Sequence, residues 1–264
     1  MKTVGIIGGS GFIGSHVTKK FLTEGYTVKV SVTDIRKNEK YQHLFQQKNS
    51  DNLTVNQLLV EDLKKLKEFI SDCDIVIHGG TPFQLNVEDA QKELFDPTIK
   101  GTENFLEAVS ENPGIEKAVL IASVAGWNTN FPLPAATKTA TDTFDETDMR
   151  FTSTESHPYA QAKFIANQTV LEFLNDNPAV AFEITTVSPV MVMGTSLSDR
   201  EDATSTGVQF LIKNNIAPDD FFQSLYDSDV HFAIVDVRDV AEAIFKAATT
   251  KGLHGKDYLL SSES

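Results

Sequence analysis

Short apolar runs alternate along the chain with segments in which apolar residues recur every three or four positions. The short runs predict β-strands, and the spaced segments predict helices with one apolar face. We expect strands at residues 2–8, 26–34, 53–62, 74–80, 115–123 and 182–194, and helices at residues 12–24, 63–72, 97–111 and 157–176.

Three of the runs, residues 4–7, 75–77 and 118–122, are nearly continuous in Val, Ile, Leu and Ala. Such runs are typical of parallel strands that are covered on both faces. The alternation therefore predicts an α/β fold with a doubly wound parallel sheet. Residues 127–156 and 195–230 break the alternation. Both follow the carboxyl ends of strands, where open α/β sheets bind ligands, so we place the substrate there.

Three glycines, Gly8, Gly11 and Gly14, lie between the first predicted strand and the first predicted helix. Here a phosphate group can meet free backbone N–H groups at the positive end of the helix dipole. A side chain at Gly11 would block that approach, and one at Gly14 would push the helix away from the strand. A tight turn is the alternative reading. The position in the first strand–helix unit favours a dinucleotide site, in which we include Phe12 and Ile13.

Further residues at strand ends extend this site. Asp62 ends the third predicted strand and is placed to meet an adenine, or else to cap the helix that follows. Gly79 and Gly80 end the fourth strand and would let a cofactor cross the sheet edge, unless they form only another turn. We count Leu63 and Thr81 with the cofactor-binding residues.

The choice of dinucleotide depends on the end of the second strand. Asp34 can accept a hydrogen bond from a ribose 2′-hydroxyl, which favours NAD. Arg36 and Lys37 can instead pair with the 2′-phosphate of NADP. We assign residues 1–194, with 231–250 returning to them, to a Rossmann-type NAD(P)-binding domain.

The remaining residues, 195–264, form a small C-terminal substrate lobe in this interpretation. The candidate catalytic groups precede it. Tyr159 and Lys163 are four residues apart, hence on one face of a helix, and Ser123 ends the fifth strand. A nearby ammonium and an oxidised nicotinamide would both lower the pKa of the phenol. The tyrosine could then exchange a proton with a carbonyl or alcohol oxygen, while the serine hydroxyl holds that oxygen.

The composition and charge of the chain limit the kinds of partner that it can bind. The formal net charge of −14 argues against nucleic acid and against an anionic membrane surface, since both require cationic patches. No apolar run approaches the ~20 residues needed to span a bilayer. The single cysteine, Cys73, excludes an internal disulfide and a cysteine-rich metal site. With no signal peptide recognisable, we expect a cytoplasmic protein without a metal site.

Taken together, these motifs make the chain similar to the extended short-chain dehydrogenases/reductases of the NAD-dependent epimerase/dehydratase superfamily. Within them it resembles the dihydroflavonol 4-reductase-like group of aldehyde and ketone reductases. The resemblance covers essentially the whole chain and is carried by "GGSGFIGSHV", "GYTVKVSVTD", "HGGTPF", "PTIKGTENFLEA", "IASVAGW", "FDETD", "YAQAK", "TTVSPVMVMG" and "VDVRDVAEA".

This resemblance implies that Ser123, Tyr159 and Lys163 form the catalytic triad, with Lys163 also holding the nicotinamide ribose. It implies further that the nicotinamide is lined by three consecutive residues, Ser188, Pro189 and Val190. It favours NADP over NAD and is compatible with a homodimer.

Two departures from the resemblance bear on these expectations. Reductases of this group usually carry an arginine for the 2′-phosphate at the position of Thr33, which weakens the preference for NADP without reversing it. The sequence also stops at "DYLLSSES", where relatives continue. We therefore expect either a truncated chain or a differently built pocket.

The function expected is reduction of an aldehyde or ketone with NAD(P)H. One alternative is a sugar-nucleotide epimerase or dehydratase with the same triad, and another is a non-catalytic dinucleotide sensor. A diphosphate needs cations, but residues 195–230 contain only Arg200 and Lys213. Against these two stand the acids Asp199, Glu201, Asp202, Asp219, Asp220, Asp227 and Asp229. The same segment offers, as pocket lining or as core, Phe210, Leu211, Phe221, Phe222, Leu225 and Tyr226.

Overall fold

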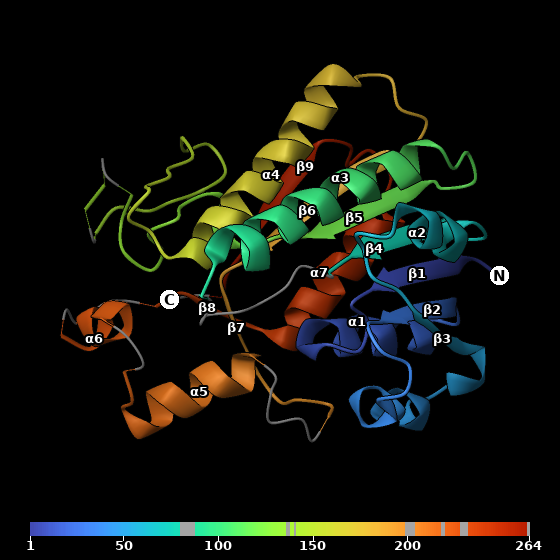
Figure 1. Ribbon diagram of the computed structural model, residues 1–264, viewed down its shortest axis with the longest axis horizontal. Coiled ribbons are helices and arrows are strands. Elements are labelled where there is room, and N and C mark those ends of the chain that lie inside the picture. Colours follow the sequence, from blue (N-terminus) through green and yellow to red (C-terminus); the bar gives the residue numbers. More distant parts are fainter. Residues whose placement is uncertain are drawn as a thin grey trace.

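The computed structural model describes residues 1–79, 88–135, 138–139, 141–198, 204–217, 220–227 and 232–262. Its main feature is a parallel seven-stranded sheet in the order β3-β2-β1-β4-β5-β6-β9 (Figure 1). The strands are β1 (Thr3–Ile7), β2 (Thr27–Val32), β3 (Leu53–Gln57), β4 (Ile75–His78), β5 (Lys117–Ile121), β6 (Glu183–Pro189) and β9 (Lys256–Leu260). This order is that of the Rossmann fold, and it confirms the predicted doubly wound sheet.

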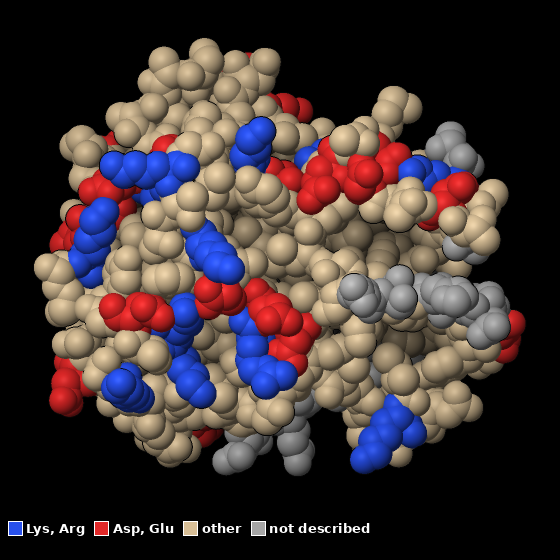
Figure 2. Space-filling model, turned by 180° about the vertical axis from the view of Figure 1, so that it is seen from behind, with Lys and Arg blue, Asp and Glu red and all other residues tan. Residues whose placement is uncertain are grey.

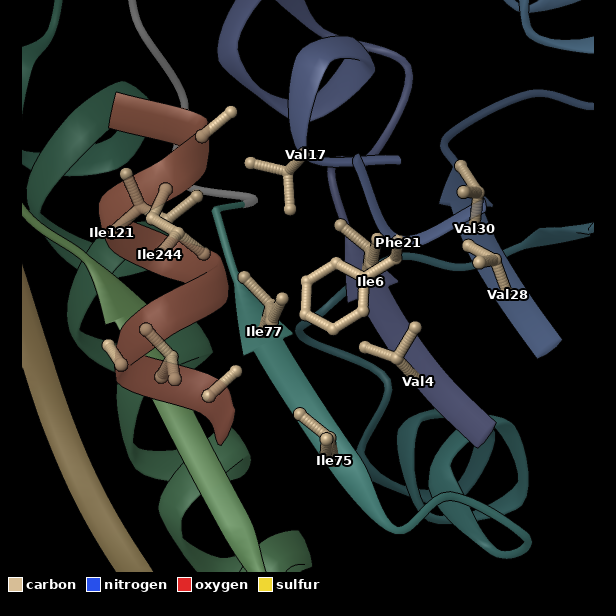
Figure 3. Packing of buried hydrophobic residues seen from close by; sticks show 14 of the residues in the cluster. Val4, Ile6, Val17, Phe21, Val28, Val30, Ile75, Ile77, Ile121 and Ile244 are labelled. Atoms are coloured by element: carbon tan, nitrogen blue, oxygen red, sulfur yellow. The ribbon is translucent and has the colours of Figure 1, made fainter. Parts of the chain in front are cut away.

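Helices cover both faces of the sheet, as Figure 1 shows. The five covering helices are α1 (Phe12–Thr23), α2 (Leu63–Ile70), α3 (Asp96–Ser110), α4 (Pro158–Asp176) and α7 (Val237–Thr249). Helices α1 and α7 pack on one face, where Val17, Phe21 and Ile244 meet the strands (Figure 3). Helices α2, α3 and α4 pack on the other face.

The strands supply the core of both layers because successive side chains point to opposite faces. In β4, Ile75 and Ile77 belong to the cluster under α1 and α7, whereas Val76 belongs to the other cluster. In β5, Val119 belongs to the cluster under α1 and α7, and Leu120 belongs to the other cluster. A strand that is buried on both faces must be apolar throughout, which explains the continuous runs in the sequence.

Several elements differ from the sequence prediction. Strand β3 ends at Gln57 and not at residue 62, and helix α7 was not predicted. The predicted strand 182–194 is divided into β6 and β7 (Met191–Met193), and β7 pairs with β8 (Ile234–Asp236) in a separate two-stranded sheet. Strand β9 was not predicted, and it pairs with β6 at the edge of the main sheet. The assignment of residues 251–264 to the substrate lobe is therefore wrong for β9.

The remaining helices, α5 (Thr204–Asn214) and α6 (Asp220–Asp227), lie beyond β7 at the carboxyl side of the sheet (Figure 1). Tyr226 links them, because its hydroxyl donates to the main-chain oxygens of Leu211 and Ile216, each at 3.1 Å. None of the helices in the described ranges combines the length and apolar character required to cross a membrane.

Candidate active site

The glycine loop joins β1 to α1 and leaves the start of that helix open. Gly8 has a φ of +78°, which favours glycine, and its N–H donates to the Ser31 hydroxyl at 3.1 Å. Gly11 occupies the N-cap position of α1 without any side-chain cap, and no acidic residue lies in the first turn. The amide groups of this turn can therefore bind an anion.

The fold requires glycine at position 14 but not at position 11. A Cβ atom at Gly14 would lie 2.1 Å from the Gly8 carbonyl oxygen and 2.8 Å from the Gly9 Cα, so α1 could not pack against the loop. A Cβ atom at Gly11 would meet only the Gly8 oxygen, at 3.3 Å. The backbone at Gly11 is extended (φ −72°), so neither conformation nor the fold demands glycine there. The space at Gly11 fits the approach of a phosphate group.

At the end of β2, Asp34 is paired with Arg36. The guanidinium group donates to both carboxylate oxygens at 2.9 Å, and this interaction lowers the pKa of Asp34 to about 2. The Arg36 side chain is 85 % exposed, and Thr33 beside it is also exposed. Arg36 and Lys37 are thus both exposed, at the edge of the sheet where the adenosine ribose would lie.

The other predicted cofactor contacts have ordinary structural roles as well. Asp62 caps α2 by accepting a hydrogen bond from the Lys65 N–H at 3.1 Å, and Leu63 begins that helix. Gly79 follows β4, and a Cβ there would lie 3.0 Å from the Ile121 side chain. Gly80 and Thr81 lie outside the described residues.

The three candidate catalytic residues come together at the carboxyl side of the sheet. Ser123 follows β5 and caps the 3₁₀ turn η5 (Val124–Gly126) by accepting from the Ala125 N–H at 3.2 Å. Tyr159 and Lys163 lie in the first turns of α4, which begins at Pro158 after His157 as N-cap. The hydroxyl groups of Tyr159 and Ser123 are hydrogen-bonded. The Lys163 Nζ lies 5.7 Å from the centroid of the Tyr159 ring.

Burial dominates the electrostatics of this group. It raises the pKa of Tyr159 above its ordinary value, although the hydrogen bond from Ser123 acts in the opposite direction. We expected a nearby ammonium and an oxidised nicotinamide to lower the pKa of Tyr159, but in the protein alone burial raises it. Burial also lowers the pKa of Lys163 to about 8. The tyrosine is therefore a neutral phenol, and the lysine can lose its proton near neutral pH.

His78, which the sequence reasoning did not select, lies in the same buried region. It is the last residue of β4, and its ring stacks on Phe105 with the centroids 4.7 Å apart. Burial, assisted by the charge of Lys163, lowers the pKa of His78 to about 3. Among the described residues, no group bonds to its Nδ1. The only sequence signal was a polar residue at the end of an apolar run.

A partly buried polar network, also unpredicted, lies beside the three candidate catalytic residues. The Arg150 guanidinium donates to the Gly126 main-chain oxygen, to Asn167 and to Asp257. Asp257 accepts further bonds from Asn167 at 2.9 Å and from the Ser188 hydroxyl at 2.7 Å. The Ser188 side chain is thus directed to this network, which we call the Arg150 network.

The neighbouring residues of β6 have different surroundings. Pro189 is buried at the end of the strand, and Val190 is half-buried with its N–H bonded to the Leu260 oxygen at 3.0 Å. Their predicted contact with a nicotinamide stays a prediction.

A hollow lies between residues 127–156 and the part of the molecule that carries α5, seen on the right of Figure 2. Its floor is mostly uncharged, and acidic atoms gather on its upper rim. In the lobe, Phe222 and Leu225 are both 8 % exposed and belong to the core, whereas Phe210 is 58 % exposed. The aromatic residues of the lobe are therefore divided between core and surface.

Comparison with known proteins agrees with this architecture. Residues 4–261 match the NAD dependent epimerase/dehydratase family. The chain is 27 % identical to cinnamoyl-CoA reductase CAD2 of Medicago truncatula, covering 94 % of this chain and 74 % of that protein. It is also 27 % identical to the NADPH-dependent methylglyoxal reductase GRE2 of Saccharomyces cerevisiae, over 98 % of this chain and 78 % of that one.

The solved structure of yeast methylglyoxal/isovaleraldehyde reductase Gre2, complexed with NADPH, superposes with a TM-score of 0.78 at 25 % identity. It covers 98 % of this chain and 78 % of the yeast chain. These findings confirm the resemblance to the extended short-chain reductases. The chain belongs to the NAD dependent epimerase/dehydratase family.

Proposed function

We propose that the protein is an NADPH-dependent reductase that converts an aldehyde or ketone to an alcohol. The observation that carries this proposal is the hydrogen-bonded pair of Ser123 and Tyr159 with Lys163 beside the ring. The pair lies at the same edge of the sheet as the open start of α1. The preference for NADPH rests on the relatives, since both the yeast reductase and its solved complex carry that cofactor in their names.

The chain's own groups would hold the cofactor. The free amide groups of the first turn of α1, and the space at Gly11, fit the pyrophosphate. Arg36 and Lys37 would meet the 2′-phosphate, and Lys163 the nicotinamide ribose. When bound, the nicotinamide supplies the hydride that reaches the carbonyl carbon.

The proton comes from the protein. The Tyr159 phenol, kept neutral by burial, donates its proton to the carbonyl oxygen while Ser123 donates a hydrogen bond to the same oxygen. The positive form of Lys163 favours the phenolate that results, because the two charges attract. The lowered pKa of Lys163, about 8, lets this residue pass a proton back to the tyrosine near neutral pH.

The charge around the hollow supports a neutral substrate. In residues 127–156 the acids are Asp142, Asp145, Glu146, Asp148 and Glu155. The bases there, Lys138 and Arg150, are each engaged in an ion pair. A sugar nucleotide or another phosphorylated substrate would find no unpaired cation in this loop's described part. A carbonyl compound without a phosphate is therefore the substrate class that we propose.

The test is oxidation of NADPH and of NADH, followed at 340 nm with a panel of aldehydes and ketones. We expect turnover of at least one neutral carbonyl compound, faster with NADPH. Calorimetric titration with a UDP-sugar tests the epimerase alternative. Micromolar binding of the UDP-sugar without carbonyl turnover would favour an epimerase, and tight NADPH binding without either would favour a sensor.

A further inference from the structure

The turn that carries Ser123 and the helix that carries Tyr159 meet at one partly buried guanidinium group, that of Arg150. We propose that Arg150 is a positioning residue for the reduction, holding Ser123 against Tyr159 by binding both elements at once. This inference rests on the proposed function, and the experiment below separates the failure of one from the failure of the other.

The contacts of a single guanidinium nitrogen join the two elements. Arg150 Nη1 lies 2.8 Å from the main-chain oxygen of Gly126 and 2.6 Å from the Asn167 side-chain oxygen. Gly126 closes the turn that Ser123 caps, and Asn167 lies one helical turn after Lys163 on α4. A shift of the guanidinium therefore moves the serine relative to the tyrosine–lysine pair.

The guanidinium is itself fixed in place. Arg150 Nη2 lies 2.9 Å from Asp257 on β9, and these two side chains are 15 % and 8 % exposed. Asp257 also accepts from Asn167 and from Ser188 at the end of β6, so its charge is well compensated. On its other side the guanidinium stacks on Trp127, 3.7 Å from the ring centroid. Arginine offers several donors in one rigid plane, which an ammonium group cannot do.

The turn and the helix are in direct contact at the same place. A Cβ atom at Gly126 would lie 3.1 Å from the Asn167 Cβ. The two elements are thus packed with little free space, and Arg150 closes the contact from the side. A misplacement of about 1 Å at reacting groups can cost about 10²-fold in rate.

The first experiment measures the rate of Arg150→Lys per NADPH-binding site, so that only folded molecules are counted. We expect kcat to fall about 10- to 100-fold, while the dissociation constant for NADPH changes less than about threefold. The matched control is Glu183→Gln. It weakens a partly buried ion pair with Lys117 at the amino-terminal ends of β5 and β6, away from the candidate site. This control should lower stability but leave kcat per site unchanged.

The second experiment repeats Arg150→Lys in the Tyr159→Phe background. If Arg150 acts by holding the Ser123 hydroxyl against the Tyr159 hydroxyl, the double variant should be less than about threefold slower than Tyr159→Phe alone. A general loss of structure would instead slow both backgrounds by the same factor. That equal effect would overturn the proposal, as would a kcat of Arg150→Lys within twofold of wild type.

Asn167→Ala covers the case in which Arg150→Lys does not fold, because it leaves the ion pair between Arg150 and Asp257 intact. We expect this variant to lower kcat about fivefold or more, again without loss of cofactor affinity. Unchanged kcat in Asn167→Ala overturns the proposal. If wild type turns over no carbonyl compound, or Tyr159→Phe keeps full activity, it is the proposed function that fails.

Discussion

Adding one methyl group at Gly14 should destabilise the protein, adding one at Gly11 should leave its stability nearly unchanged, and both changes should weaken cofactor binding. At Gly14 the new Cβ would lie 2.1 Å from the Gly8 oxygen, whereas real Cβ contacts essentially never fall below 3.0 Å. The Gly8 oxygen is a backbone atom that cannot turn aside, so α1 must move away from the loop. Overpacking of this kind costs about 1–3 kcal/mol, or a fall in Tm of about 2–10 °C for a chain of this size.

At Gly11 the same methyl group meets only the Gly8 oxygen, at 3.3 Å. We expect the free energy of unfolding of Gly11→Ala to stay within about 1 kcal/mol of wild type. The methyl group would nevertheless occupy the space of the pyrophosphate and remove hydrogen bonds worth about 1.5–3 kcal/mol each. NADPH should therefore bind at least about tenfold more weakly to both variants.

The assay combines thermal unfolding without cofactor and fluorescence titration with NADPH. Gly114→Ala serves as control, since its Cβ would meet only the end of the Asn112 side chain, at 3.3 Å. This control should leave both quantities unchanged. Gly11→Ala with normal affinity for NADPH, or Gly14→Ala with normal Tm, would refute the reasoning.

Three further predictions concern charges and the proton. Lys163→Met should stabilise the cofactor-free protein by about 1–3 kcal/mol at pH 7, because the pKa is lowered from 10.5 to about 8 in the folded state. Wild-type stability should rise between pH 8 and pH 10.5, where the unfolded chain binds more protons, and thermal unfolding of Lys163→Met should lack that rise. Arg36→Ala should weaken the binding of NADPH at least about tenfold but that of NADH little. Equal losses of affinity for the two cofactors in titration would contradict the assignment of Arg36 to the 2′-phosphate. Tyr159→Phe should lower kcat by about 10²–10⁴-fold with little change in NADPH affinity, and near-normal kinetics would mean another proton donor.

Much of the fold could be predicted because buried parallel strands are apolar on both faces. Strands β1, β4 and β5 are of this kind. Strand β9 was missed because it lies at the sheet edge, where "KDYLL" carries charged residues and no continuous run. The division of the strand at 182–194 was missed because Pro189 and Val190 are apolar and do not interrupt the pattern.

The meeting of Ser123, Tyr159 and Lys163 at the carboxyl side of the sheet could be predicted because each stands at a position defined by local sequence, the end of a strand or one face of a helix. Their catalytic role stays a prediction. The position of Arg150 could not be predicted, because its partner Asp257 is 107 residues away and only the folded sheet brings them together. The raised pKa of Tyr159 could not be predicted from the sequence either, since the burial of its side chain depends on the packing of α4. Local sequence patterns thus identified the candidate catalytic residues, whereas the contacts around them join residues that are far apart in the sequence.

The most direct test of the central claim is transfer of deuterium from NADPH labelled at C4 of the nicotinamide ring. With a carbonyl substrate from the panel, both C4-labelled epimers should be supplied in turn and the alcohol analysed by mass spectrometry. A reductase places deuterium from one epimer on the carbinol carbon of the product, and Tyr159→Phe should slow this transfer by about 10²-fold or more. An epimerase or a sensor would leave the label in the cofactor, and an unlabelled alcohol from both epimers would contradict the account.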